Sequence, residues 1–198
     1  MTAYCLIHGS GQGPEGWKLL VHELEQRGHS VLTPAFEVNR IDEGLIWHAE
    51  TIVSALDRSG MNPADVVCVA HSASGMYLPL IAERWSPRRM VFLAAVVPRP
   101  GISVMEQHRN DPSMFNPAWV RQNPQDEKVA LEFVYHDCPP DRLDWALSTR
   151  VMFMPGARWN NHVHCAPGLR FRRATSCAPT IGRLRQSGNA TPLESYSE

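Results

Sequence analysis

The sequence predicts an α/β fold, a mostly parallel sheet flanked by helices, and two observations support this. Short apolar segments alternate with amphipathic helical segments through the first hundred residues. The apolar segments, such as Val66–Ala70, are continuous runs that do not alternate with polar residues, which is typical of parallel strands buried on both faces. A length of 198 residues fits one domain of this kind.

The expected elements follow one another closely. The strands are expected at 4–7, 30–33, 65–70 and 89–96, and the helices at 17–27, 45–56 and 74–85. Gly28 stands where a glycine commonly terminates a helix. The second helix carries apolar residues at i, i+4, i+7 and i+8, which marks one buried face.

The pattern changes after Pro98, where proline recurs and only short helices are expected, at 126–134 and 141–148. An insertion after a sheet strand is a candidate lid, so we expect a lid at about 98–149. Aromatic side chains there either line a substrate pocket or pack the lid onto the core; they are Phe115, Trp119, Phe133 and Trp145.

The segment from residue 156 onwards differs from the rest, with six arginines, no lysine, no aspartate and few apolar residues. We therefore expect a core at 1–155 and an atypical, weakly ordered tail at 156–198. A change of reading frame or another alteration of the C-terminus near residue 155 would produce the same composition. It would also leave the strand at 89–96 as an unpaired apolar edge, open to self-association.

Composition excludes several classes of partner. Nineteen Lys and Arg residues against 20 Asp and Glu residues leave a net charge of -1, which gives no electrostatic drive toward nucleic acid or an anionic membrane. No apolar run is long enough for a membrane span, and no signal peptide is visible at the N-terminus. Five scattered cysteines form no disulfide framework, which predicts a reduced, cytoplasmic protein. No metal site is expected, because His162 and His164 have no partner cluster.

The chemistry is concentrated in Ala70-His-Ser-Ala-Ser-Gly75, which lies between a buried strand and a helix. This context is typical of a nucleophile elbow, a strained turn that needs small side chains two residues before and two after the nucleophile. Ala70 and Ser74 satisfy that need around Ser72. The turn would expose the Ser72 hydroxyl and direct the Ala73 N–H toward a developing oxyanion.

A second glycine-rich loop, His8 to Trp17, follows the first strand and can bring the Ser10 N–H beside the serine as a second oxyanion donor. Gly11–Gly16 also reads as the G-x-G-x-x-G dinucleotide motif. Pro14 removes an N–H from that turn, and the second strand ends at Thr33-Pro34 without a ribose-binding acid. These residues favour the oxyanion interpretation.

Together the two segments resemble the α/β-hydrolase family, in particular its small lidded esterases and hydroxynitrile lyases with an H-G-x-x-x-G loop and a G-H-S-x-G elbow. The resemblance covers Tyr4 to about Leu147. It implies Ser72 as nucleophile, backbone N–H groups of Ser10 and Ala73 as oxyanion donors, and no cofactor. The implied reaction is hydrolysis of a small carboxylic ester or similar acyl substrate, with lyase chemistry as another use of the fold.

The acid and base of a triad are missing from their family positions, after the strand that follows the lid and after the last strand. Asp137 with His162 or His164 matches the chain order serine, acid, histidine, but neither histidine lies in the glycine-flanked loop after a strand that the family gives its base. Two functions therefore stay open. One is a serine hydrolase; the other is a non-catalytic protein of the same fold without a working base, either a binding protein or an inactive product.

Overall fold

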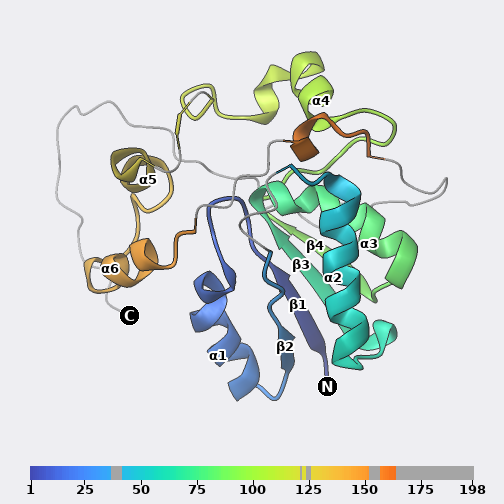
Figure 1. Ribbon diagram of the computed structural model, residues 1–198. Helices are drawn as coiled ribbons and strands as arrows, with labels where there is room; N and C mark the ends of the chain where they lie inside the picture. Colours follow the sequence, from blue (N-terminus) through green and yellow to red (C-terminus); the bar gives the residue numbers. More distant parts are fainter. Residues whose placement is uncertain (37–41, 121, 124–125, 152–156, 164–198) are drawn as a thin grey trace, which may run out of the picture.

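Four parallel strands form the centre of the protein in the computed structural model (Figure 1). They are β1 (Ala3–Ile7), β2 (Ser30–Leu32), β3 (Val66–His71) and β4 (Arg89–Leu93), in the order β2-β1-β3-β4. The structure describes residues 1–36, 42–120, 122–123, 126–151 and 157–163. The predicted α/β class, with its parallel sheet, is confirmed.

Helices cover the two faces of the sheet unequally. Helix α1 (Lys18–Gln26), preceded by the 3-10 helix η1 (Pro14–Trp17), lies on one face, and α2 (Leu45–Ser59) and α3 (Leu78–Trp85) lie on the other (Figure 1). The first helix ends before Gly28, whose φ of 77° is the left-handed conformation that glycine adopts readily. The predicted glycine stop is therefore confirmed.

Successive residues of each strand point to opposite faces and so supply two cores. Cys5 and Ile7 of β1 and Cys68 and Ala70 of β3 pack against α2 and α3 in the larger core. Leu6 packs on the α1 side in a smaller cluster, together with Trp17, Val67 and Val69. The larger core dominates the hydrophobic stabilisation, because it buries many more side chains.

Strand β4 differs from its prediction. The sequence predicts a strand to residue 96, buried on both faces, but β4 ends at Leu93 because Ala94 adopts a φ of 43° and turns the chain. Val91 and Leu93, whose side chains face the α1 side, are each 39% exposed, because α1 packs over the other strands. Among the described strands β4 is an edge, and self-association through it stays a prediction.

The helix after β3 also begins differently from its prediction. The chain runs from β3 straight into a 3-10 helix, η3 (Ser72–Tyr77), and the α-helix starts only at Leu78. Pro79 explains the boundary, because proline has no N–H to donate to the carbonyl four residues earlier and is accepted only in the first turn of an α-helix.

The segment predicted to be a lid contains the two predicted helices, α5 (Glu127–Phe133) and α6 (Pro140–Ser148). It also contains α4 (Val104–Asn110) and a 3-10 turn, η4 (Pro112–Met114), which the sequence analysis missed. Ser103 caps α4 by accepting a hydrogen bond from the Glu106 N–H, a Ser-x-x-Glu capping pattern that was readable in the sequence. In Figure 1, α4 lies beyond the carboxyl ends of the strands, the end at which β3 leads to Ser72.

Aromatic residues of the predicted lid segment pack on one another, and Phe115 also packs on the larger core. The rings of Trp119 and Phe133 lie 5.6 Å apart, and Phe115 lies 6.3 Å from Trp159 of the 3-10 helix η5 (Ala157–Asn160). Of the two interpretations of these aromatic residues, the contacts favour packing.

The predictions for 152–156 and 164–198, including His164, fall outside the described residues. Within the described part, Cys5, Cys68 and Cys138 are free thiols, and no three metal-ligating side chains cluster. None of the helices there combines the length and apolar character needed to cross a bilayer.

Candidate active site

Ser72 occupies a strained turn at the carboxyl end of β3. Its φ of 56° lies in the left-handed region, which costs an ordinary L-residue roughly 1–2 kcal/mol. The Ser72 carbonyl accepts a hydrogen bond of 2.9 Å from the Val96 N–H, so the segment after β4 holds the turn in place. A buried strand, a strained serine and an immediate helix together give the geometry expected of a nucleophile elbow.

Two glycines let neighbouring segments approach this turn. A Cβ on Gly9 would lie 2.9 Å from Ser72 Cβ and 3.1 Å from His71 Nδ1. A Cβ on Gly75 would lie 2.1 Å from the Val96 carbonyl oxygen. Neither position tolerates a side chain without movement of the backbone, so both glycines are fixed by close packing around Ser72.

The small residues predicted beside Ser72 are fully buried. Ala70 and Ser74 are both 0% exposed, and the Ser74 hydroxyl donates a hydrogen bond to the His8 carbonyl. This bond ties the elbow to the loop after β1. His8 itself is buried with its ring 4.9 Å from that of Phe36, which is the packing role expected of a turn histidine.

The two predicted oxyanion donors occupy different local structures. Ala73 is the second residue of η3, and N–H groups in a first helical turn have no partner within the helix. Ser10 follows Gly9, whose close approach to Ser72 brings the loop beside the elbow.

Gln12 connects this loop to two other segments, and sequence reasoning did not identify it. Its side-chain Oε1 accepts a 2.7 Å hydrogen bond from His71 Nδ1, and its backbone forms an antiparallel bridge with Arg150. The Val151 N–H donates to the Gly11 carbonyl at 3.1 Å. The loop that carries Ser10 is therefore held from the β3 side and from the residues that follow α6.

Burial lowers the pKa of His71 below its usual value of 6.5, so the ring is neutral at pH 7. Because the Gln12 oxygen can only accept, the proton of the neutral ring is on Nδ1 and the lone pair is on Nε2. No local signal in the sequence identifies this pair, because its members are 59 residues apart.

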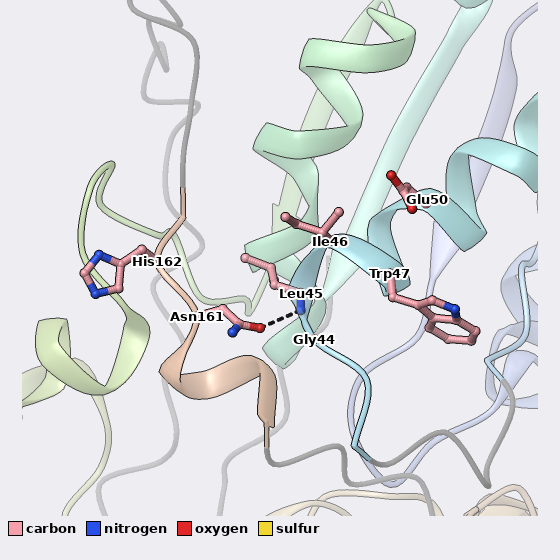
Figure 2. Close-up of a pocket in the computed structure, with 7 residues that line it drawn as sticks. All are labelled: Gly44, Leu45, Ile46, Trp47, Glu50, Asn161 and His162. Atoms are coloured by element: carbon pink, nitrogen blue, oxygen red, sulfur yellow. Dashed lines mark hydrogen bonds between the residues drawn. The ribbon is translucent and has the colours of Figure 1, made fainter.

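The acid and base candidates are not brought to Ser72 by the described residues. Asp137 is exposed between α5 and α6, and no hydrogen bond in the described part joins the Ser72 hydroxyl to a histidine. His162 is exposed and bridges Ser103 through its backbone. Its imidazole points away from Leu45 and Glu50 in Figure 2.

His162 lines a pocket of about 480 Å³ at the N-terminus of α2 (Figure 2). The Asn161 side chain caps this helix by accepting a 2.7 Å hydrogen bond from the Leu45 N–H. A Cβ on Gly44 would lie 2.7 Å from the same Asn161 oxygen, so a side chain there would push the capping Asn161 side chain aside. Glu50, across the pocket, pairs with Arg84.

Comparisons with known proteins agree with this architecture. Polyneuridine aldehyde esterase has a similar structure, with a TM-score of 0.65 and 18% identity over 83% of this chain and 74% of that protein. An extracellular alpha/beta-hydrolase from a Paenibacillus species, described as sharing homology with Tobacco Salicylic Acid Binding Protein 2, gives a TM-score of 0.60 and 16% identity over 84% and 72%. At these identities the likeness shows the fold.

Sequence comparison identifies the family. A carbendazim hydrolyzing esterase from Nocardioides sp. (strain SG-4G) is 29% identical over 114 residues, which cover 53% of this chain and 46% of that protein. The chain thus matches about half the length of this curated relative. The sequence profile described as "Alpha/beta hydrolase family" matches residues 6–188, so the chain belongs to the alpha/beta hydrolase family.

Proposed function

We propose that the protein is a serine hydrolase that acts on a small carboxylic ester or a similar acyl substrate through nucleophilic Ser72. The observation that carries the proposal is the φ of 56° at Ser72, kept in place by the Val96 hydrogen bond and by two glycines with no room for a Cβ. Strain of this kind persists only where the surroundings enforce it, and it gathers at functional sites.

In the proposed reaction, the Ser72 oxygen attacks the acyl carbonyl carbon and the carbonyl π electrons move to its oxygen. The N–H groups of Ser10 and Ala73 stabilise that oxyanion, a contribution of about 3–4 kcal/mol per donor in other hydrolases. Its collapse expels the alcohol and leaves an acyl-serine, which water then hydrolyses. The similarity to a carbendazim hydrolyzing esterase supports an ester or a similar acyl bond as the target.

The serine proton must pass to a base, and this requirement separates the hydrolase from a non-catalytic protein. His71 does not suit the role, because its Nδ1 is bonded to Gln12 and its ring lines a cavity that Ser72 does not line. Asp137 with His162 or His164 would complete the chain order of a triad, but the described residues bring neither Asp137 nor His162 to Ser72, so mutation has to identify the base. We further propose that 1–155 is the hydrolase core, with its lid at about 98–149.

The test is labelling of the purified chain with a fluorophosphonate probe, which reacts with serines activated by a base and an oxyanion hole. The parent chain should be labelled and Ser72→Ala should not. His162→Ala and His164→Ala then identify the base, because its loss should abolish labelling while circular dichroism stays unchanged.

The absence of labelling in a folded parent chain would refute the hydrolase proposal. It would leave the non-catalytic alternative, a member of the fold that binds small molecules without a working base. If labelling is positive, ester and cyanohydrin substrates separate hydrolase from lyase chemistry.

A further inference from the structure

The two oxyanion donors of the proposed mechanism come from different segments of the chain. Ala73 belongs to the elbow, and Ser10 belongs to the loop at residues 8–12, which we call the Ser10 loop. Donors must lie about 2.7–3.1 Å from the developing oxyanion. The contacts that hold the Ser10 loop against the elbow therefore decide whether the two N–H groups can serve one oxyanion.

One contact holds the start of the Ser10 loop. The Ser74 hydroxyl donates a hydrogen bond to the His8 carbonyl, 66 residues away in the sequence. Ser74 is 0% exposed and His8 is 3% exposed, so water does not compete for this bond. In the G-x-S-x-G elbow pattern this position is glycine, which has no side chain to form it. The bond is therefore a feature of this chain and not of the elbow motif.

The His8 side chain carries this constraint to the next peptide. His8 Nδ1 lies 3.0 Å from the Gly9 carbonyl oxygen and donates to it, since a carbonyl can only accept. A planar trans peptide points its N–H opposite to its C=O. A fixed Gly9 carbonyl therefore also fixes the direction of the Ser10 N–H, which belongs to the same peptide.

A second contact holds the end of the loop. Gln12 Oε1 accepts the 2.7 Å hydrogen bond from His71 Nδ1, and His71 is the last residue of β3. Between the two contacts, Gly9 approaches the elbow so closely that a Cβ on it would lie 2.9 Å from Ser72 Cβ. The two hydrogen bonds flank this approach, one from the residue before Ser72 and one from the second residue after it.

We propose that Ser74 and Gln12 are positioning residues of the hydrolase. They hold the Ser10 loop so that its N–H group and that of Ala73 face one oxyanion. Both act through the loop and not on the substrate. This inference rests on the proposed function, because that function gives the two N–H groups their role.

A simple packing role predicts a different outcome. If the Ser74 hydroxyl only satisfied a buried donor, its loss would lower the stability of the chain and leave the folded molecules fully reactive. If it positions the loop, the folded molecules lose reactivity. The turnover number kcat should then fall while KM stays about the same, because the oxyanion exists only on the way to and from the transition state.

The test compares the purified 198-residue chain with Ser74→Ala, Gln12→Ala and the double variant. Each single variant keeps one attachment, so its rate of fluorophosphonate labelling should fall about tenfold. The double variant should lose about 100-fold, the effect that a misplacement of about 1 Å can have. With p-nitrophenyl acetate, kcat should fall by similar factors while KM changes less than about twofold.

Thr51→Val is the matched control. It removes a half-buried hydroxyl that donates to the Trp47 carbonyl at 3.0 Å within α2, a bond that does not involve the Ser10 loop. This variant should be labelled, and should hydrolyse the ester, as the parent does.

Amide hydrogen exchange measures the loop without relying on activity. Residues 9–12 should exchange at least about fivefold faster in Ser74→Ala than in the parent, the effect of one lost hydrogen bond. Gln12→Ala should show the same change, and Thr51→Val should show none.

Unchanged labelling of the folded double variant would overturn the proposal, and so would slower labelling without faster exchange at residues 9–12. If the double variant does not fold by circular dichroism, the single variants decide by the same measurements. A parent chain that is not labelled refutes the hydrolase function instead, and the exchange rates then decide whether Ser74 and Gln12 hold the loop.

Discussion

Replacing Gly75 with alanine tests the close packing that shapes the elbow. The new Cβ would lie 2.1 Å from the Val96 carbonyl oxygen, 3.0 Å from Ala95 Cβ and 3.1 Å from Phe92 Cδ1. Ordinary contact would require the Val96 peptide to move by roughly 1 Å, because the obstacle is backbone and not a flexible side chain.

That movement would disturb the hydrogen bond from the Val96 N–H to the Ser72 carbonyl. Overpacking costs about 1–3 kcal/mol and the loss of one hydrogen bond about 1 kcal/mol, so we expect the free energy of unfolding to fall by about 2–4 kcal/mol. For a chain of this size the melting temperature should drop by roughly 4–16 °C.

The assay is urea unfolding followed by far-UV circular dichroism, with Gly16→Ala as the matched control. A Cβ on Gly16 would meet only Thr149 Oγ1, at 3.9 Å, so its unfolding free energy should change by less than about 0.5 kcal/mol. If the two alanine variants prove equally stable, the contact between η3 and the Val96 peptide does not constrain the elbow as argued.

Three further perturbations test other features. Ser72→Gly should be more stable than Ser72→Ala by about 0.5–1 kcal/mol in thermal unfolding, because glycine adopts the left-handed φ without strain. Ser86 has a φ of 51°, so Ser86→Gly should show a similar gain over Ser86→Ala, and no gain at either site would contradict the strain argument. Asn161→Ala removes the cap of α2, so it should lower the unfolding free energy by about 0.5–2 kcal/mol and speed amide exchange in the first turn of that helix. Asn62→Ala, which removes an exposed 3-10 cap, is the control and should leave the first turn of α2 protected. The unfolding free energy of the parent should fall relative to His71→Asn as the pH drops below 6.5, because the unfolded chain protonates this histidine first; parallel pH profiles would refute the lowered pKa.

Local patterns predicted most of the sheet and its helices, because a few consecutive residues are enough to predict the buried positions of a strand such as β3 or a helix such as α2. The early end of β4 was not predictable in this way. It depends on Ala94 turning the chain so that Val96 can reach Ser72, a contact between separate elements.

The same distinction between local patterns and contacts of distant residues applies to the candidate site. The strained turn at Ser72 lies where a local sequence motif predicts one, whereas the Gln12–His71 hydrogen bond and the Asn161 cap join residues 59 and 116 positions apart. Such pairs appear only when the fold brings loops together at the ends of the strands.

The two buried thiols at the centre of the sheet, Cys5 and Cys68, offer a way to measure how often the sheet opens. Cys5 stands opposite Cys68 on adjacent strands, both are fully buried, and the hydrogen bond between the two thiols together with burial raises the pKa of the Cys5 thiol. Neither sulfur can meet an alkylating reagent until β1 and β3 expose their inner face. Their rate of alkylation therefore counts openings of the central sheet, whereas Cys138, half-buried between α5 and α6, can react without such an opening.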